Sequence, residues 1–203
     1  MNSLIKKIEK LKKSKINKQV KNRIKEFERF KNKSNNQWFS ELCFCILTAN
    51  SKAETAIRIQ NEIGNNFYTS HKIKQTIKKY KHRFHNNKAS YILEARKHKN
   101  IKTIIQKEKQ PREWLIKNIK GLGYKEASHF LRNIGYKNFA IIDRHILNIL
   151  TEHKIISKKP KSLTKVKYLE IERKFNELAK KVKLSPAELD LLLWYSKTGK
   201  VLK

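Results

Sequence analysis

The chain has 203 residues, 38% of them hydrophobic, and its 49 lysines and arginines against 17 aspartates and glutamates give a formal net charge of +32. This length predicts one compact domain or two small lobes, and the charge predicts a polyanionic partner, either nucleic acid or an acidic membrane surface. No apolar run is long enough to cross a bilayer and no signal peptide is present, which excludes most membrane and secreted classes and indicates a soluble cytoplasmic protein.

Hydrophobic residues recur at helical spacing through the first half of the chain. The spacing predicts two amphipathic surface helices around residues 4–11 and 20–27, then a helix over 37–49 that is apolar on all sides and therefore buried. A further helix ends at Gly64, a glycine suited to a C-cap. Two more are expected around residues 73–80 and 89–93, and Pro111 is expected to open another.

The C-terminal third is also predicted to be helical. An amphipathic stripe runs from Tyr168 to Val182, and Ser185-Pro186-Ala187-Glu188 has the form of a capping box with proline at the first helical position. That last helix is expected to end near Gly199. Because no extended alternating strand pattern occurs, the sequence predicts an all-α fold.

Cys43 and Cys45 lie inside the apolar run over 37–49. Two thiols with this spacing in a helix fit neither a zinc site nor an iron–sulfur cluster. Packing in the core is therefore the expected role, and no metal site is predicted.

A helix, a Gly-x-Gly turn and a second helix are predicted over residues 115–131. Gly121 and Gly123 are two of only five glycines in the chain. Glycine permits the positive φ of a tight hairpin, and a helix that starts there offers backbone N–H groups to an anion such as DNA phosphate. Lys120 and Lys125 add positive charge. An ordinary helix–helix turn remains the alternative.

Asp143 is one of only two aspartates in the chain, the other being Asp190. It follows the apolar run 140–142 and precedes a helical pattern that begins at Ile146. This position suits a helix N-cap, and it also suits a partly buried catalytic carboxylate. The two roles are compatible, so both stay open.

The hairpin, the lysine two residues after its second glycine and the aspartate beyond resemble the helix-hairpin-helix-GPD superfamily of DNA glycosylases. The resemblance is closer to the archaeal-type 8-oxoguanine DNA glycosylases. It covers essentially the whole chain and is carried by residues 42–50, 82–84, 118–135, 140–146 and 194–203. The iron–sulfur cysteines of the endonuclease III branch are absent after residue 180, which disfavours that branch.

The resemblance implies two helical lobes with the helix-hairpin-helix motif at the mouth of the cleft between them. One lobe is expected over residues 31–137, and the other combines 1–30 with 138–203. No cofactor is required, although a monovalent cation at the hairpin is implied. The expected partner is double-stranded DNA that contains 8-oxoguanine, bound by a monomer associated with the nucleoid.

The resemblance also implies a DNA glycosylase and abasic-site lyase in which Lys125 is the nucleophile and Asp143 the essential carboxylate. The target base has to leave the stack before it can react. Neutral Lys125 attacks the sugar, Asp143 stabilises the cationic transition state, and β-elimination from the resulting Schiff base cuts the strand 3′ to the lesion.

Further contacts are expected on both DNA strands. Lys120, Gly121, Gly123 and His145 are expected to hold phosphates, Asn50 to face the opposite strand, and Trp194 and Lys203 to bind the extruded base. Lys203 would offer its α-carboxylate to the N7–H group that distinguishes 8-oxoguanine from guanine. The alternatives are an interface histidine at 145, a helix-ending Asn50 and a core-packing Trp194.

Two rival functions remain. A glycosylase of the same fold that acts on oxidised pyrimidines would share the hairpin and both catalytic residues. A non-enzymatic binding protein would keep the hairpin for phosphate contact, but it would gain nothing from a carboxylate at Asp143.

Overall fold

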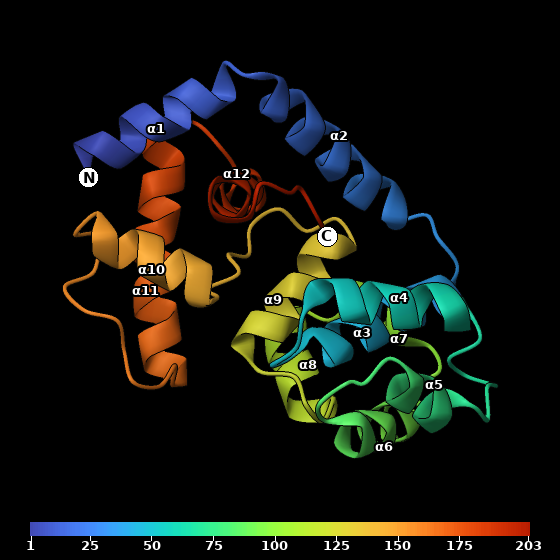
Figure 1. The fold of residues 1–203 in the computed structure, drawn as a ribbon. Coiled ribbons are helices and arrows are strands. Elements are labelled where there is room, and N and C mark those ends of the chain that lie inside the picture. Colours follow the sequence, from blue (N-terminus) through green and yellow to red (C-terminus); the bar gives the residue numbers. More distant parts are fainter. The chain divides into compact units, whose positions relative to one another are not determined.

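The computed structural model describes all 203 residues and contains twelve α-helices and no strand (Figure 1). The all-α prediction is confirmed. The chain divides into two compact units: unit 1 comprises Met1–Arg29 and Gly135–Lys203, and unit 2 comprises Phe30–Ile134. The central lobe that we predicted from the sequence covers residues 31–137, close to the observed bounds of unit 2.

Unit 2 is built around α3 (Asn35–Thr48), which packs against α4, α6, α7 and α9. Every residue from Trp38 to Ala49 is buried, because this helix carries apolar side chains on all of its faces. Its first turn is closed by a capping box between Ser34 and Gln37. The other helices of the unit are α4 (Ala53–Ile63), α5 (Ile73–Lys79), α6 (His85–Ala95), α7 (Ile101–Lys107), α8 (Pro111–Asn118) and α9 (Tyr124–Asn133).

Unit 1 contains α1 (Asn2–Lys12), α2 (Lys15–Phe30), α10 (Arg144–Glu152), α11 (Lys165–Lys181) and α12 (Pro186–Thr198). Figure 1 shows α12 end-on, and it packs against α1, α10 and α11. The predicted Ser185–Glu188 capping box starts α12, and Gly199 ends it in the left-handed region with φ of 70°.

Most helix boundaries follow the local sequence signals. Pro111 occupies the first turn of α8 and Gly64 caps α4, as predicted. The short helix α7 was not predicted separately, and Leu93, one of the apolar residues on which the helix around residues 89–93 was predicted, is 48% exposed. Cys43 and Cys45 are buried free thiols, which confirms core packing. None of the helices combines the length and the apolar character needed to cross a membrane.

Candidate functional site

The hairpin between α8 and α9 requires glycine at its first position. Gly121 has a φ of +87°, and a Cβ atom there would lie 2.4 Å from Cδ2 of Tyr91. Both the backbone conformation and the close contact therefore exclude a larger residue. Gly123 has an extended backbone with φ of −104°. Of the two hairpin glycines, only Gly121 therefore has the positive φ that we expected.

The hairpin rests on α6 and the residues that follow it. Tyr91 lies beneath Gly121, and the Lys120 ammonium stands 5.7 Å from the centre of the same ring. Lys120 also lies 3.6 Å from a Glu94 carboxylate oxygen, and His98 Nε2 is 3.2 Å from the Asn118 carbonyl. The sequence pattern did not identify this support, because the partners are distant in the chain.

Lys125 occupies the first turn of α9 and is paired with its neighbour Glu126. The Lys125 ammonium is 3.5 Å from Glu126 Oε1, and their side chains are 26% and 14% exposed. Glu126 Oε2 accepts a hydrogen bond of 3.2 Å from the Gly123 N–H. The predicted anion site thus loses one N–H group to a protein carboxylate, whereas the N–H groups of Gly121 and Lys125 donate to no protein group. An acid three residues after the N-cap was the available signal for Glu126.

Asp143 is the N-cap of α10 in unit 1. Its Oδ1 accepts hydrogen bonds of 2.8 Å from the N–H groups of both His145 and Ile146. The other oxygen, Oδ2, makes no hydrogen bond, and the residue is half-buried. The predicted helix cap is thus confirmed. The catalytic role of Asp143 stays a prediction, and Oδ2 is the oxygen that the cap does not use.

The ring of His145 lies against that of Trp194. Their centroids are 6.4 Å apart at an interplanar angle of 83°, an edge-to-face contact between α10 and α12. Both side chains are only partly buried, in contrast to Leu191, Leu192 and Leu193 on the same helix, which are fully buried. Trp194 therefore lies at the edge of the core and is partly exposed.

The chain end is anchored on unit 1. Val201 packs against the core cluster of α2 and α12, and its carbonyl accepts a 3.5 Å hydrogen bond from Arg23. Lys203, two residues later, is partly exposed. Asn50, by contrast, is exposed in unit 2 just after α3, with a positive φ of 58° that asparagine tolerates better than most residues.

The predicted site residues thus form two groups. Asn50, Lys120, Gly121, Gly123 and Lys125 belong to unit 2, and Asp143, His145, Trp194 and Lys203 belong to unit 1. The function that we propose requires both groups to act on one substrate.

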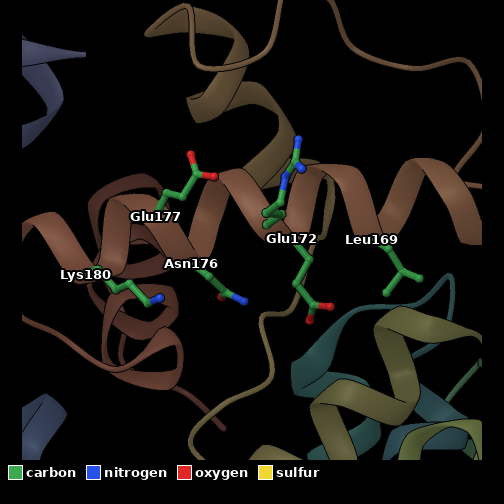
Figure 2. A pocket seen from close by; sticks show the side chains of 6 residues that line it. Leu169, Glu172, Asn176, Glu177 and Lys180 are labelled. Carbon is green, nitrogen blue, oxygen red and sulfur yellow. The ribbon is translucent and has the colours of Figure 1, made fainter.

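A pocket of about 350 Å³ lies along α11, and no predicted site residue lines it (Figure 2). Leu169, Glu172, Arg173, Asn176, Glu177 and Lys180 line it. The Glu172 carboxylate accepts a hydrogen bond of 3.2 Å from the Ala140 N–H, so this residue ties α11 to the non-helical segment before Asp143. Glu172 therefore has a structural explanation independent of any ligand.

Comparison with known proteins identifies the family. A model of the helix-hairpin-helix 8-oxoguanine DNA glycosylase family matches residues 20–184. The chain belongs to this family. It is 55% identical over 205 residues to an 8-oxoguanine DNA glycosylase/AP lyase of Methanocaldococcus jannaschii, covering 98% of this chain and 99% of that protein. A protein of the same name from Korarchaeum cryptofilum is 43% identical, with 100% of this chain and 99% of the relative covered.

The fold is shared with crystal structures of the same glycosylase family. The M. jannaschii 8-oxoguanine glycosylase/lyase in complex with a 15mer DNA containing 8-oxoguanine is similar to this chain with a TM-score of 0.97 and 53% identity. The match covers 99% of this chain and 100% of that one. The 8-oxoguanine DNA glycosylase of Thermotoga maritima, at 37% identity, gives a TM-score of 0.94 with 100% and 99% covered.

Proposed function

We propose that this protein is a bifunctional DNA glycosylase and abasic-site lyase that excises 8-oxoguanine from duplex DNA. The observation that carries the proposal is the placement of Lys125 in the first turn of the helix after the Gly121 hairpin, in a chain of this glycosylase family. A lysine at a helix N-terminus beside a phosphate-binding turn suits an amine that attacks a sugar in the DNA backbone.

In the proposed reaction, the neutral Lys125 amine forms a bond to C1′ while the bond from C1′ to the base breaks. The base leaves with the bonding electrons and takes up a proton, and the attacking nitrogen loses one. The C1′–O4′ bond of the sugar ring then breaks, O4′ takes up a proton, and the nitrogen lone pair forms the C1′=N bond of a protonated Schiff base. Removal of a C2′ proton then breaks the C3′–O bond and releases the downstream strand with a 5′ phosphate. Asp143 Oδ2, which makes no hydrogen bond in the protein, would stabilise the cationic sugar.

The hairpin would hold the DNA backbone through the N–H groups of Gly121 and Lys125 and through Lys120. The contact of Lys120 with Glu94 is a surface ion pair at 3.6 Å, with the lysine side chain 58% exposed. Such a pair is weak, so the ammonium is able to turn to a phosphate.

We expect Lys120→Gln to lower the slope of log affinity against log salt by about one unit, because one fewer counterion is released on binding. Titration of an undamaged duplex at several salt concentrations measures this slope. An unchanged slope would place Lys120 away from the DNA. Lys74→Gln, which removes an exposed charge from α5, is the matched control.

Base recognition is proposed at Trp194 and Lys203, with the tryptophan stacking on the base and the terminal carboxylate accepting from N7–H. The anchored Val201 supports this, because it limits the movement of the residues that follow it. His145, in edge contact with Trp194, would contact phosphate, and Asn50 would face the opposite strand.

Deletion of Lys203 is expected to slow 8-oxoguanine excision at least tenfold, about 1.4 kcal/mol of transition-state stabilisation. Cleavage at a preformed abasic site should fall much less, because that reaction needs no base contact. Single-turnover assays on the two duplexes give the comparison. Equal loss of both activities, or none, would contradict the assignment, as would full excision by a protein extended at its C-terminus.

The direct test of the function is borohydride trapping on duplexes that carry 8-oxoguanine, thymine glycol or no lesion. The proposal requires a covalent protein–DNA adduct and strand cleavage with 8-oxoguanine. A preference for thymine glycol would favour the oxidised-pyrimidine glycosylase. Binding without an adduct on any duplex would favour a non-enzymatic hairpin protein.

The hairpin also has oxygens to offer a monovalent cation. The carbonyl groups of Lys120, Gly121 and Leu122 accept no hydrogen bond, whereas those of Asn118, Ile119 and Gly123 do. A bound cation there would hold the turn against DNA phosphate. We further propose that the protein acts as a monomer at the nucleoid.

A further inference from the structure

The three residues before Asp143 form a buried segment of unit 1 that belongs to no helix. Ala140 and Ile142 are fully buried, and Ile141 is 6% exposed. Buried backbone N–H and C=O groups need hydrogen-bond partners, and a segment outside the helices has no helical ladder to supply them. The groups that supply them instead indicate what holds the backbone in front of Asp143.

The partners are side chains of α11. The Tyr168 hydroxyl donates a hydrogen bond of 2.8 Å to the Ala140 carbonyl and accepts one of 3.2 Å from the Ile142 N–H. The Glu172 carboxylate, on the helix shown in Figure 2, accepts a hydrogen bond of 3.2 Å from the Ala140 N–H. Tyr168 and Glu172 are four residues apart, so they lie on the same face of α11 in adjacent turns. One face of α11 thus satisfies three backbone groups of the segment.

Both side chains are themselves buried, Tyr168 at 1% and Glu172 at 7% exposure. Burying a hydroxyl or a carboxylate costs free energy unless the group is hydrogen-bonded. Phenylalanine would fill nearly the same space as tyrosine, so packing explains the ring of Tyr168 but not its hydroxyl. The hydroxyl is explained by the segment, because it bonds the two peptide groups on either side of Ile141 at once.

These contacts lead directly to the backbone of Asp143. The peptide group between Ile141 and Ile142 donates its N–H to Tyr168, and its carbonyl accepts a hydrogen bond of 3.0 Å from the Asp143 N–H. On the other side, Asp143 is held by the cap that its Oδ1 makes on α10. The carboxylate is therefore fixed from two directions, by α10 after it and by α11 through the segment before it.

We propose that Tyr168 and Glu172 are positioning residues that place the Asp143 carboxylate for catalysis. A group that stabilises a transition state electrostatically has to be preorganised, and a displacement of about 1 Å can cost on the order of a hundredfold in rate. The inference rests on the proposed function, in which Asp143 stabilises the cationic sugar.

The main test is Tyr168→Phe in the full-length protein, which removes both hydrogen bonds and keeps the ring. Single-turnover excision of 8-oxoguanine at saturating protein is expected to fall about tenfold, because Asp143 is less well placed. Affinity for the same duplex should stay within twofold, since Tyr168 is buried and contacts no DNA. A loss of affinity as large as the loss of rate would make Tyr168 a general structural residue and overturn the proposal.

Ile171→Val is the matched control. Ile171 is 1% exposed on the same helix, and this substitution weakens the packing without removing a hydrogen bond. Its excision rate should stay within twofold of wild type. Thermal melting verifies that both variants are folded at the assay temperature. Equal losses of rate in the two variants would assign the effect to stability and contradict a positioning role.

A double-mutant cycle tests whether Tyr168 acts through Asp143. In the Asp143→Asn background the negative charge is already absent, so Tyr168→Phe is expected to slow excision less than twofold further. A full further tenfold loss would mean that Tyr168 acts on some other group, and the assignment would then be wrong.

Glu172 offers a conservative variant as a second, independent measurement. Glu172→Gln keeps an oxygen that can accept from the Ala140 N–H, whereas Glu172→Leu leaves that group without its acceptor. Excision should be slowed about tenfold by leucine and less than threefold by glutamine, with duplex affinity retained in both. Equal rates in the two variants would remove Glu172 from the positioning role.

The outcomes separate this inference from the proposed function. If wild-type protein gives no borohydride adduct, the proposed function is wrong whatever Tyr168 does. If the adduct forms and Tyr168→Phe excises 8-oxoguanine as fast as wild type, the positioning role is wrong and the function stands. A rate loss that is confined to excision and disappears in the Asp143→Asn background supports the proposal.

Discussion

Lys125→Gln is expected to abolish both 8-oxoguanine excision and borohydride trapping while duplex binding stays largely intact. Glutamine cannot form a Schiff base, and the backbone of the hairpin that we propose to hold phosphate is unchanged. The Lys125 side chain is 26% exposed and its ammonium lies 3.5 Å from Glu126 Oε1, so the shorter glutamine leaves no hole in the core. Trapping and a binding titration on the same 8-oxoguanine duplex measure the two properties separately.

Lys117→Gln is a suitable control for this substitution. Lys117 is an exposed residue in the last turn of α8, and its replacement removes the same charge close to the hairpin. This variant should retain the covalent adduct. An adduct formed by Lys125→Gln would mean that another amine is the nucleophile.

Asp143→Asn is expected to slow excision by two to three orders of magnitude, about 3–4 kcal/mol, the range found for lost electrostatic stabilisers. The substitution separates the two roles of this residue. Asparagine caps helices about as well as aspartate, so the hydrogen bonds from the His145 and Ile146 N–H groups can persist. Only the negative charge is lost. Single-turnover excision measures the effect, and thermal melting checks that the fold is preserved.

Asp143→Ala provides the comparison. It removes both the cap and the charge, so it should lose about 1 kcal/mol of stability as well as activity. If Asp143 serves only as a cap, the asparagine variant will be nearly as active as wild type and the alanine variant will merely melt earlier. That pattern would remove Asp143 from the chemistry.

Helix positions and the hairpin could be predicted from the sequence because their signals are local. Ser185 and Glu188 close a capping box, Pro111 opens a helix, and Gly199 ends one, all through contacts within a single turn. The hairpin followed from the two glycines, and the proposed catalytic pair from a resemblance that family membership now supports. Periodicity was less informative for α7, which has only seven residues. It also misjudged Leu93, since an apolar position in a pattern need not meet a neighbour.

The surroundings of the proposed nucleophile were decided only by tertiary structure. Tyr91 requires glycine at position 121 because α6 packs beneath the hairpin, a contact that no local pattern encodes. Lys88 on α6 is only 5% exposed, yet it is one of 49 basic residues, and nothing in its neighbours along the chain separates it from a solvated lysine. Its burial, and with it the effect on its charge, arises from packing with segments far away in sequence. Residue type fixes which groups can ionise, but the packing of distant helices fixes which of them lose their water and which charges they meet.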